Sequence, residues 1–246
     1  MSKHFELLQQ LEKEQSLGAS PNGASIAPVV SNVGNGLSTW ADDESLRLVQ
    51  QIFLRQTQEP PRVVVFAGID HGNGCSRICA SVAETLAKNA GGRVCLLEAN
   101  FRSPSLSGLL GVPNHHGFTE ALLQNAPIGT YTKLIGRENL WFLSSGTVAI
   151  DSPNLLTSDR LKLRVDQLRK EFDFVIIDVP PLTRYSDAVV LGQLSDGLVL
   201  IIEADSTRRE AAAAVAENLR SVKVPILAAV LNKRTFPIPE KIYSRL

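Results

Sequence analysis

Apolar runs and amphipathic segments alternate along most of the chain. The run RVVVFAG at 62–68 precedes a glycine-containing turn, an apolar-periodic segment at 76–91 and a second run, RVCLLEA, at 93–99. Apolar runs of this kind are typical of strands buried on both faces, and a helix between two of them indicates a parallel crossover. The same pattern predicts further strands at 139–146, 173–179, 196–204 and 226–232, and helices near 117–125, 155–171, 185–195 and 207–221.

Strands that alternate with helices predict a mainly parallel sheet with helices on both faces. We therefore expect an α/β fold, a three-layer sandwich, over residues 41–246. In such a sheet the ligand site lies at the carboxyl ends of the strands.

Residues 1–40 differ in composition from the rest of the chain. Phe5, Leu8 and Leu11 lie at helical spacing, and a stretch rich in Gly, Ser, Pro and Asn follows them. We expect a short N-terminal helix that docks on a partner or on the body of the domain, followed by a flexible linker. A frayed N-terminal tail is an equally weighted alternative. The domain is then expected to open with an amphipathic helix capped by Asp42 or Asp43.

The composition disfavours nucleic acid as a partner, a membrane span and a secreted, disulfide-bonded fold. The 246 residues include 25 Lys and Arg and 25 Asp and Glu, so the net charge of zero gives no general attraction to nucleic acid. No apolar run approaches the roughly 20 residues of a membrane span, and the first residues lack the pattern of a secretory signal. Three cysteines are too few for a disulfide framework. We expect a cytoplasmic protein with no nucleic-acid partner.

The turn after the first long strand has features of a phosphate-binding loop. In AGIDHGNGCS at 67–76, Gly72 and Gly74 allow backbone amides to converge on an anion at a helix start. Ser76 takes the position of a magnesium-binding hydroxyl, but Cys75 stands where a P-loop carries its lysine. The candidate nucleotide-binding residues of this turn are Gly72, Asn73, Gly74, Cys75, Ser76 and Arg77.

A later strand supplies an acidic residue suited to the same site. FDFVIIDVPP at 172–181 places Asp178 at the end of a buried run, the position of a Walker B carboxylate directed at phosphate-bound magnesium. A carboxylate in such a run needs a partner to offset its lost hydration. Ser76 and Asp178 are therefore the candidate magnesium ligands.

The order of these segments resembles the cytoplasmic P-loop domain of the bacterial tyrosine kinases (BY-kinases) of capsule and exopolysaccharide synthesis, within the MinD/ParA-like superfamily. The similarity covers roughly residues 42–246 and includes ESLRLVQ at 44–50 and LGVPNHHGFTEALL at 110–123. It implies a P-loop NTPase-like fold and Mg-ATP or Mg-ADP as the ligand. It also implies that Asn232 contacts adenine, although an asparagine after a strand is equally an ordinary turn residue.

The resemblance further implies partners and a modification. The expected partner is a transmembrane polysaccharide co-polymerase or chain-length regulator, an active kinase paralogue, or a second copy of the chain. Such a partner would hold the protein at the inner membrane. Glu44 and Arg47 are the expected interface residues, on a helix that packs against a neighbouring subunit in the family. Tyr243 is the expected phosphorylation site.

Two departures from the family pattern bear on catalysis. Cys75 replaces the lysine, and the acidic motif D-x-D-x-R becomes Glu98-Ala99-Asn100-Phe101-Arg102. Glu98 and Asp178 remain as candidate catalytic carboxylates, whereas Asn100 carries no charge. Loss of one preorganised donor beside a transition state costs about 3–4 kcal/mol.

Three functional hypotheses follow. The first is a regulatory or scaffold subunit of this family with reduced or absent kinase activity. The alternatives are an active tyrosine autokinase or ATPase with a rearranged site that uses Arg77, and a positioning ATPase of the MinD/ParA type, which the neutral charge disfavours. Cys75 and Cys79 share a helix face, and we interpret them as small buried side chains, with a redox or metal-binding pair as the alternative.

Overall fold

The computed structural model describes residues 29–30, 40–54, 59–136, 139–147, 156 and 159–234. Within this part of the chain the strands form one sheet in the order β1-β8-β7-β2-β6-β3-β5-β4. All neighbouring strands pair in parallel except β4 and β5. The strands are β1 (Val29–Val30), β2 (Val63–Gly68), β3 (Val94–Glu98), β4 (Lys133–Leu134), β5 (Leu140–Leu143), β6 (Phe174–Val179), β7 (Gly197–Glu203) and β8 (Ile226–Asn232).

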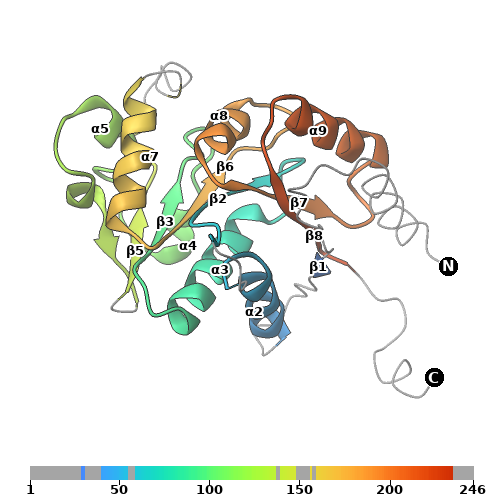
Figure 1. Cartoon of the computed structure of the whole chain (residues 1–246), viewed down its shortest axis with the longest axis horizontal. Coiled ribbons are helices and arrows are strands. Elements are labelled where there is room, and N and C mark those ends of the chain that lie inside the picture. The colour runs from blue at the N-terminus through green and yellow to red at the C-terminus, as the bar shows by residue number, and fades with distance from the viewer. Residues whose placement is uncertain are drawn as a thin grey trace.

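Helices cover both faces of the sheet, which confirms the expected three-layer α/β sandwich. Figure 1 shows α2 and α3 on one face, and α7, α8 and α9 on the other. The remaining short helices lie in the connections after β3. The helices are α2 (Trp40–Ile52), α3 (Cys75–Asn89), α4 (Leu106–Leu110), α5 (Phe118–Leu123), the 3-10 helix η1 (Ile128–Tyr131), α7 (Asp159–Glu171), α8 (Asp187–Leu194) and α9 (Arg209–Ser221).

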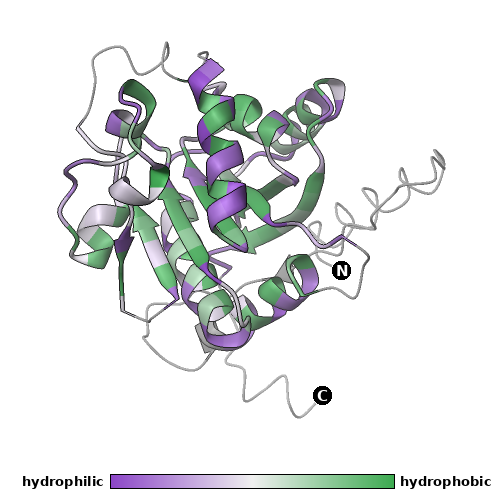
Figure 2. Ribbon diagram, turned by 60° about the vertical axis from the view of Figure 1, so that its left-hand side comes forward, coloured by the Kyte–Doolittle hydropathy of each residue, from purple (hydrophilic) through white to green (hydrophobic). Residues whose placement is uncertain are grey.

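The central strands are buried on both faces because each lies between two helix layers. In β2, Val63, Val65 and Ala67 belong to the core beneath α7 and α8, whereas Val64 and Phe66 belong to the core beneath α2 and α3. Figure 2 shows this hydrophobic sheet between helices that carry polar residues. Double burial explains why the strands are near-continuous apolar runs in the sequence.

The N-terminal part of the structure differs from the prediction in two respects. Helix α2 begins at Trp40, so Asp42 and Asp43 lie inside its first turn and do not cap it. Strand β1 pairs in parallel with β8, where its backbone satisfies hydrogen-bonding groups at the sheet edge. Residues 29–30, expected in a flexible linker, therefore extend the sheet. The helix expected around Phe5 lies outside the described residues.

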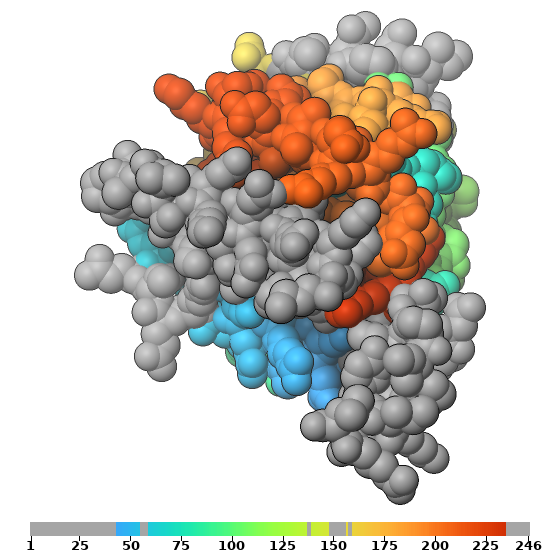
Figure 3. Space-filling view, turned by 90° about the vertical axis from the view of Figure 1, so that its right-hand side faces the viewer, coloured from blue at the N-terminus to red at the C-terminus, as the bar shows by residue number. Residues whose placement is uncertain are grey.

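The two helix layers reach the surface on either side of the β1–β8 edge of the sheet. In Figure 3, α9 lies at the top of the visible face in orange-red, and α2 lies at the bottom in blue. Among the described residues, no helix combines the length and apolar character needed to cross a membrane.

The strand order brings three functional segments together. Strand β6 lies between β2 and β3, and its Asp178 is level with Phe66 on one side and Glu98 on the other. Because these strands are parallel, the loops that follow them open at the same edge of the sheet. The loop between β2 and α3 therefore faces the loops that follow β3 and β6.

Candidate functional site

The loop between β2 and α3 has a backbone that requires glycine at two positions. Gly72 and Gly74 have φ angles of +86° and +84°, in the left-handed region that L-residues with a side chain rarely adopt. A Cβ atom at Gly74 would also lie 2.5 Å from Nδ2 of Asn232. The two glycines thus shape the turn that leads into the first residues of α3, the arrangement that the sequence predicted for binding an anion.

Side chains from the loop and from β8 fix the loop in place. Asn73 donates from Nδ2 to the carbonyl of Ile201 at 3.2 Å, and Asn232 donates from Nδ2 to the carbonyl of Asn73 at 2.7 Å. Lys233 donates from Nζ to the carbonyl of Gly72 at 2.7 Å and pairs with Glu203 at 3.2 Å. Strand β7, which neighbours β2, and strand β8, which lies beyond β7, therefore both hold the loop.

The predicted magnesium ligands are in direct contact. Ser76, in the first turn of α3, donates from Oγ to Oδ2 of Asp178 at 2.6 Å. Asp178 is 1% exposed. Burial raises the pKa of Asp178 to about 7, against the lowering effect of the Ser76 hydrogen bond. The pair links the start of α3 to the end of β6, as a serine and a carboxylate that share a cation require.

A pocket of about 470 Å³ opens beside this pair. Gly68 and residues 70–77 line one side, so all the nucleotide-binding candidates of the turn lie on its wall. Asn100, Ser103 and Pro181 are among the residues that complete it from the loops after β3 and β6. A volume of this size is within the range of small-molecule sites, about 300–1,000 Å³.

Cys75 contributes no positive charge to this pocket. Its hydrogen bond to Cys79 lowers the pKa of Cys75, but burial and the negative charge of Asp178 outweigh it and raise that pKa to about 11. Burial also raises the pKa of Cys79. Both cysteines are therefore neutral thiols near pH 7, and the wall of the pocket carries a thiol where a P-loop carries an ammonium group.

Glu98 lies away from the pocket, and its catalytic role stays a prediction. Its side chain is fully buried and does not line the pocket. Oε1 accepts hydrogen bonds from the backbone amides of Ser105 and Leu106 at 2.5 and 2.6 Å, and Oε2 accepts one from Ser107 at 3.3 Å. The carboxylate therefore holds the start of α4 instead of facing a ligand.

Asn232 is placed differently from its predicted role. It is 3% exposed and does not line the pocket, so in this structure it supports the loop and is neither a pocket contact nor a turn residue. Its Oδ1 atom is buried without a hydrogen-bond partner among the described residues.

Two further polar residues have structural partners, Arg102 near the pocket and Asp196 at the opposite end of the sheet. Arg102, in the motif that begins at Glu98, pairs with Asp187 at 3.5 Å and lies 4.1 Å from the ring centroid of Tyr185. These contacts join the segment after β3 to the segment after β6. Asp196 accepts from the backbone amides of Arg62 and Val63 at 2.7 and 2.8 Å, which is likewise structural.

Sequence reasoning missed Lys233 and Thr183. Thr183 donates from Oγ1 to the carbonyl of Ile69 at 2.8 Å and thus ties the loop after β6 to the phosphate-loop candidate. A lysine directly after the last strand, in VLNKR, was the available signal for Lys233. The contact of Lys233 with the carbonyl of Gly72 could not be inferred without the strand order, which places β8 two positions from β2.

The predicted interface residues lie on α2, which packs against α3. Ser45 and Ser81 share a hydrogen bond of 2.7 Å between these helices. Arg47 is exposed and Glu44 is half-buried. Their role in an interface stays a prediction. Tyr243, the predicted phosphorylation site, lies outside the described residues.

Comparison with known proteins identifies the family. No family model matches the chain. Tyrosine-protein kinase YwqD of Bacillus subtilis is 31% identical over 161 residues, which cover 65% of this chain and 68% of that protein. The chain belongs to the bacterial tyrosine-protein kinases. Tyrosine-protein kinase CpsD of Streptococcus agalactiae is a further relative of this BY-kinase, 27% identical over 70% of this chain and 75% of that protein.

Solved structures share the fold of this BY-kinase. The chimerical protein CapA2B2 has a TM-score of 0.80 at 19% identity, over 93% of this chain and 99% of that one. The kinase domain of Escherichia coli tyrosine kinase ETK has a TM-score of 0.76 at 18% identity, over 97% and 98%. The septum site-determining protein MinD of Pyrococcus horikoshii, complexed with Mg-ADP, has a TM-score of 0.61 at 19% identity, over 75% and 76%. The P-loop NTPase-like fold is thus confirmed.

The residues of this BY-kinase fit a magnesium nucleotide in part. The left-handed glycines and the Ser76–Asp178 pair are features that would suit such a ligand, whereas the buried Oδ1 atom of Asn232 does not line the pocket. The lysine that would contact its terminal phosphates is replaced by Cys75. Compared with a P-loop, the loop therefore keeps the glycines and the serine–carboxylate pair but lacks the positive charge of the lysine.

The structural role of Glu98 leads to a stability prediction. In Glu98→Gln, the amide keeps one acceptor but loses the charge that two backbone amides share, so we expect the free energy of unfolding to fall by about 1–2 kcal/mol. Urea denaturation followed by circular dichroism measures the change. The matched control is Glu84→Gln on α3, where the exposed pair with Lys88 spans 3.9 Å and a change within about 0.5 kcal/mol is expected. Equal stabilities of the two variants would contradict the assigned role.

Proposed function

We propose that this chain is a degenerate BY-kinase that acts as a regulatory or scaffold subunit in capsule or exopolysaccharide synthesis. One observation carries the proposal: the pocket wall has the neutral thiol of Cys75 at the position of the phosphate-binding lysine. Catalysis of phosphoryl transfer depends mainly on positioning and on stabilising negative charge in the transition state. Without this ammonium group the site lacks a large part of that stabilisation.

The lack of a well-placed general base near the pocket supports the same proposal. A carboxylate that takes the proton of an attacking hydroxyl must lie within hydrogen-bonding reach of it. Asn100 lines the pocket but has no such capacity, and Glu98 is held by the amides of α4. Asp178 remains, and its carboxylate is engaged with Ser76.

Nucleotide binding without turnover is part of the proposal. Ser76 and Asp178 would hold magnesium, and the backbone amides of residues 72–76 would hold the phosphates. The nucleotide supplies a phosphoryl group to the family's reaction, whereas in this chain it would stabilise the loop and the start of α3. Bound ATP or ADP then acts as a conformational ligand.

Partners and location follow from the family resemblance. A transmembrane polysaccharide co-polymerase, an active paralogue or a second copy of the chain would contact α2 through Glu44 and Arg47. Residues 1–40 would form a docking segment beside the domain at 41–246. The protein would then lie in the cytoplasm, at the inner membrane through its partner. Tyr243 would be at most a substrate of an active paralogue.

An active kinase or ATPase with a rearranged site is the second candidate, and two cations favour it. Lys233 brings its ammonium group to the carbonyl of Gly72 at 2.7 Å, and Arg77 lines the pocket. For either residue to replace the missing lysine, it must turn toward the terminal phosphates. The two candidates therefore differ in turnover and not in binding.

The first test of the proposal measures nucleotide binding. Calorimetric titration of the full chain with ADP is expected to show binding that strengthens with magnesium. Ser76→Ala removes one proposed magnesium ligand and is expected to weaken the magnesium-dependent binding by about tenfold. Ser221→Ala, at the end of α9, is the matched control and should leave the affinity unchanged. Absence of binding at millimolar nucleotide would contradict nucleotide binding by this chain.

The second test restores the lost charge. In Cys75→Lys the ammonium group regains its position beside the terminal phosphates, and we expect ATP turnover to rise by on the order of 10²-fold above that of the unmodified chain. Cys75→Met, of similar length but uncharged, should show no rise. Released phosphate measured with magnesium and ATP gives the rates. If the unmodified chain turns over ATP at a rate that Cys75→Ala leaves intact and Lys233→Gln abolishes, the rearranged active site replaces this proposal.

A further inference from the structure

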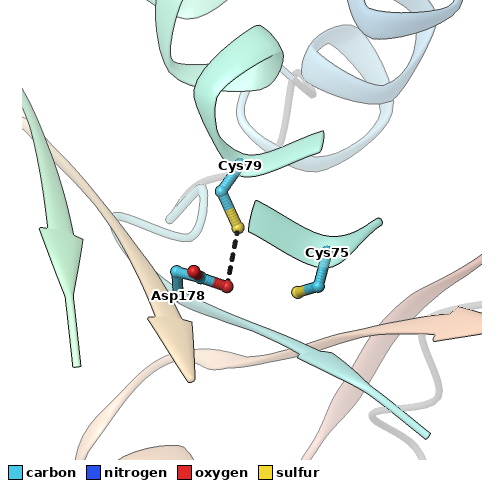
Figure 4. Close-up of side chains that lie close together, drawn as sticks. All are labelled: Cys75, Cys79 and Asp178. Carbon is cyan, nitrogen blue, oxygen red and sulfur yellow. Dashed lines mark hydrogen bonds between the residues drawn. The ribbon is translucent and has the colours of Figure 1, made fainter. Parts of the chain in front are cut away.

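Three side chains that can bind a metal ion converge behind the phosphate-loop candidate. The ligand atoms of Cys75, Cys79 and Asp178 all lie within 4.8 Å of one another, and all three residues are buried. Figure 4 shows both thiols extending from α3 toward the carboxylate at the end of β6. We propose that Cys75, Cys79 and Asp178 form a binding site for a thiophilic divalent metal ion, for which zinc is the preferred occupant.

The local structure brings the three groups close enough to share such an ion. Cys75 and Cys79 are one helical turn apart, so they share a face of α3. Asp178 is fixed by the parallel register of β6 with β2 and β3. Zinc bonds of about 2.3 Å to sulfur and about 2.0–2.2 Å to oxygen place neighbouring ligand atoms roughly 3.3–3.8 Å apart.

The observed separations approach these values. Sγ of Cys79 and Oδ1 of Asp178 are already 3.7 Å apart, the dashed contact in Figure 4. Because the remaining separations do not exceed 4.8 Å, side-chain rotations of roughly 1 Å at the ligand atoms close the site.

A cation would stabilise the buried carboxylate of Asp178 in this cluster. Asp178 is 1% exposed, and none of the ion pairs among the described residues includes it. Burial of a carboxylate without a cation is costly. A bound zinc ion would supply two positive charges and favour the thiolate forms of both cysteines, as metal coordination does. The start of α3 adds a favourable dipole for the resulting anionic ligands.

The pocket gives the ion an entry path and a fourth ligand. Cys75 and Ser76 lie on the wall of the 470 Å³ pocket, so one side of the cluster faces that space. A water molecule from the pocket, or the hydroxyl group of Ser76, which already contacts Oδ2 of Asp178 at 2.6 Å, would complete a tetrahedral set. The site is accessible although its protein ligands are buried.

The donor set selects zinc over magnesium. Two sulfur atoms favour zinc, cobalt or cadmium, whereas magnesium requires oxygen donors in octahedral geometry. Asp178 would belong to both the proposed zinc site and the magnesium site. Zinc and magnesium nucleotide should therefore compete, even though zinc binding itself does not depend on a nucleotide.

The experiment uses cobalt as a spectroscopic probe on the reduced full chain. Titration with Co²⁺ in the absence of nucleotide is expected to reach one equivalent, with thiolate-to-cobalt charge-transfer bands and tetrahedral d–d bands. Added Zn²⁺ should remove these bands. Cys75→Ser and Cys79→Ser should each weaken cobalt binding at least 100-fold, and Asp178→Asn should weaken it about tenfold or more.

Cys95→Ala is the matched control, because Cys95 is a buried thiol on β3 outside the cluster. This variant should bind one equivalent with the same spectrum, and circular dichroism should show that all variants are folded. Absence of the charge-transfer bands in the reduced chain would overturn the proposal, as would bands that survive in folded Cys79→Ser. One equivalent of zinc should also weaken magnesium-dependent ADP binding. Because cobalt binding is measured without nucleotide, failure of either proposal is distinguishable from failure of the other.

Discussion

The structure depends on how it accommodates one buried carboxylate, that of Asp178. This group lies at the end of a central strand, level with neighbours on both sides, and is 1% exposed. Its strong hydrogen bond comes from Ser76, at 2.6 Å, and that contact sets the start of α3 relative to the sheet. Both thiols, one helical turn apart on α3, also approach this carboxylate. The carboxylate therefore joins the start of α3 to the end of β6, while the loop itself is held from β7 and β8.

Cys75 changes what this carboxylate requires. A lysine at this position would place an ammonium group in the pocket near the carboxylate and near the phosphates. The thiol does not, and burial leaves the pKa of Asp178 raised to about 7. A cation from solution is then the available means of neutralising the charged form. The proposed magnesium nucleotide and the proposed thiophilic ion are two such cations: both would use Asp178, and only the thiophilic ion would add the sulfur atoms of Cys75 and Cys79.

The sequence predicted those features that a single segment determines. The apolar runs of β2, β6 and β7 mark strands buried on both faces, and Ser76 and Asp178 follow from their positions at the ends of such elements. The partners of Glu98, the amides of Ser105 and Leu106, could not be predicted because they depend on how the chain turns after β3. The loop contacts of β8 and the pairing of β1 were missed because they depend on the order of strands in the sheet, which no local pattern encodes.

The cations near the pocket argue for reduced turnover and not for a simple substitution of the lysine. Lys233 is engaged by the carbonyl of Gly72 and the carboxylate of Glu203, so its charge is already partly neutralised where it supports the loop. If it left both contacts to turn toward a phosphate, the loop would lose a support from the β8 side of the sheet. Arg77 follows Ser76 on α3 and is exposed, with a long side chain to order. Each substitute therefore carries a cost that a lysine at position 75 does not, because that position is already at the pocket wall.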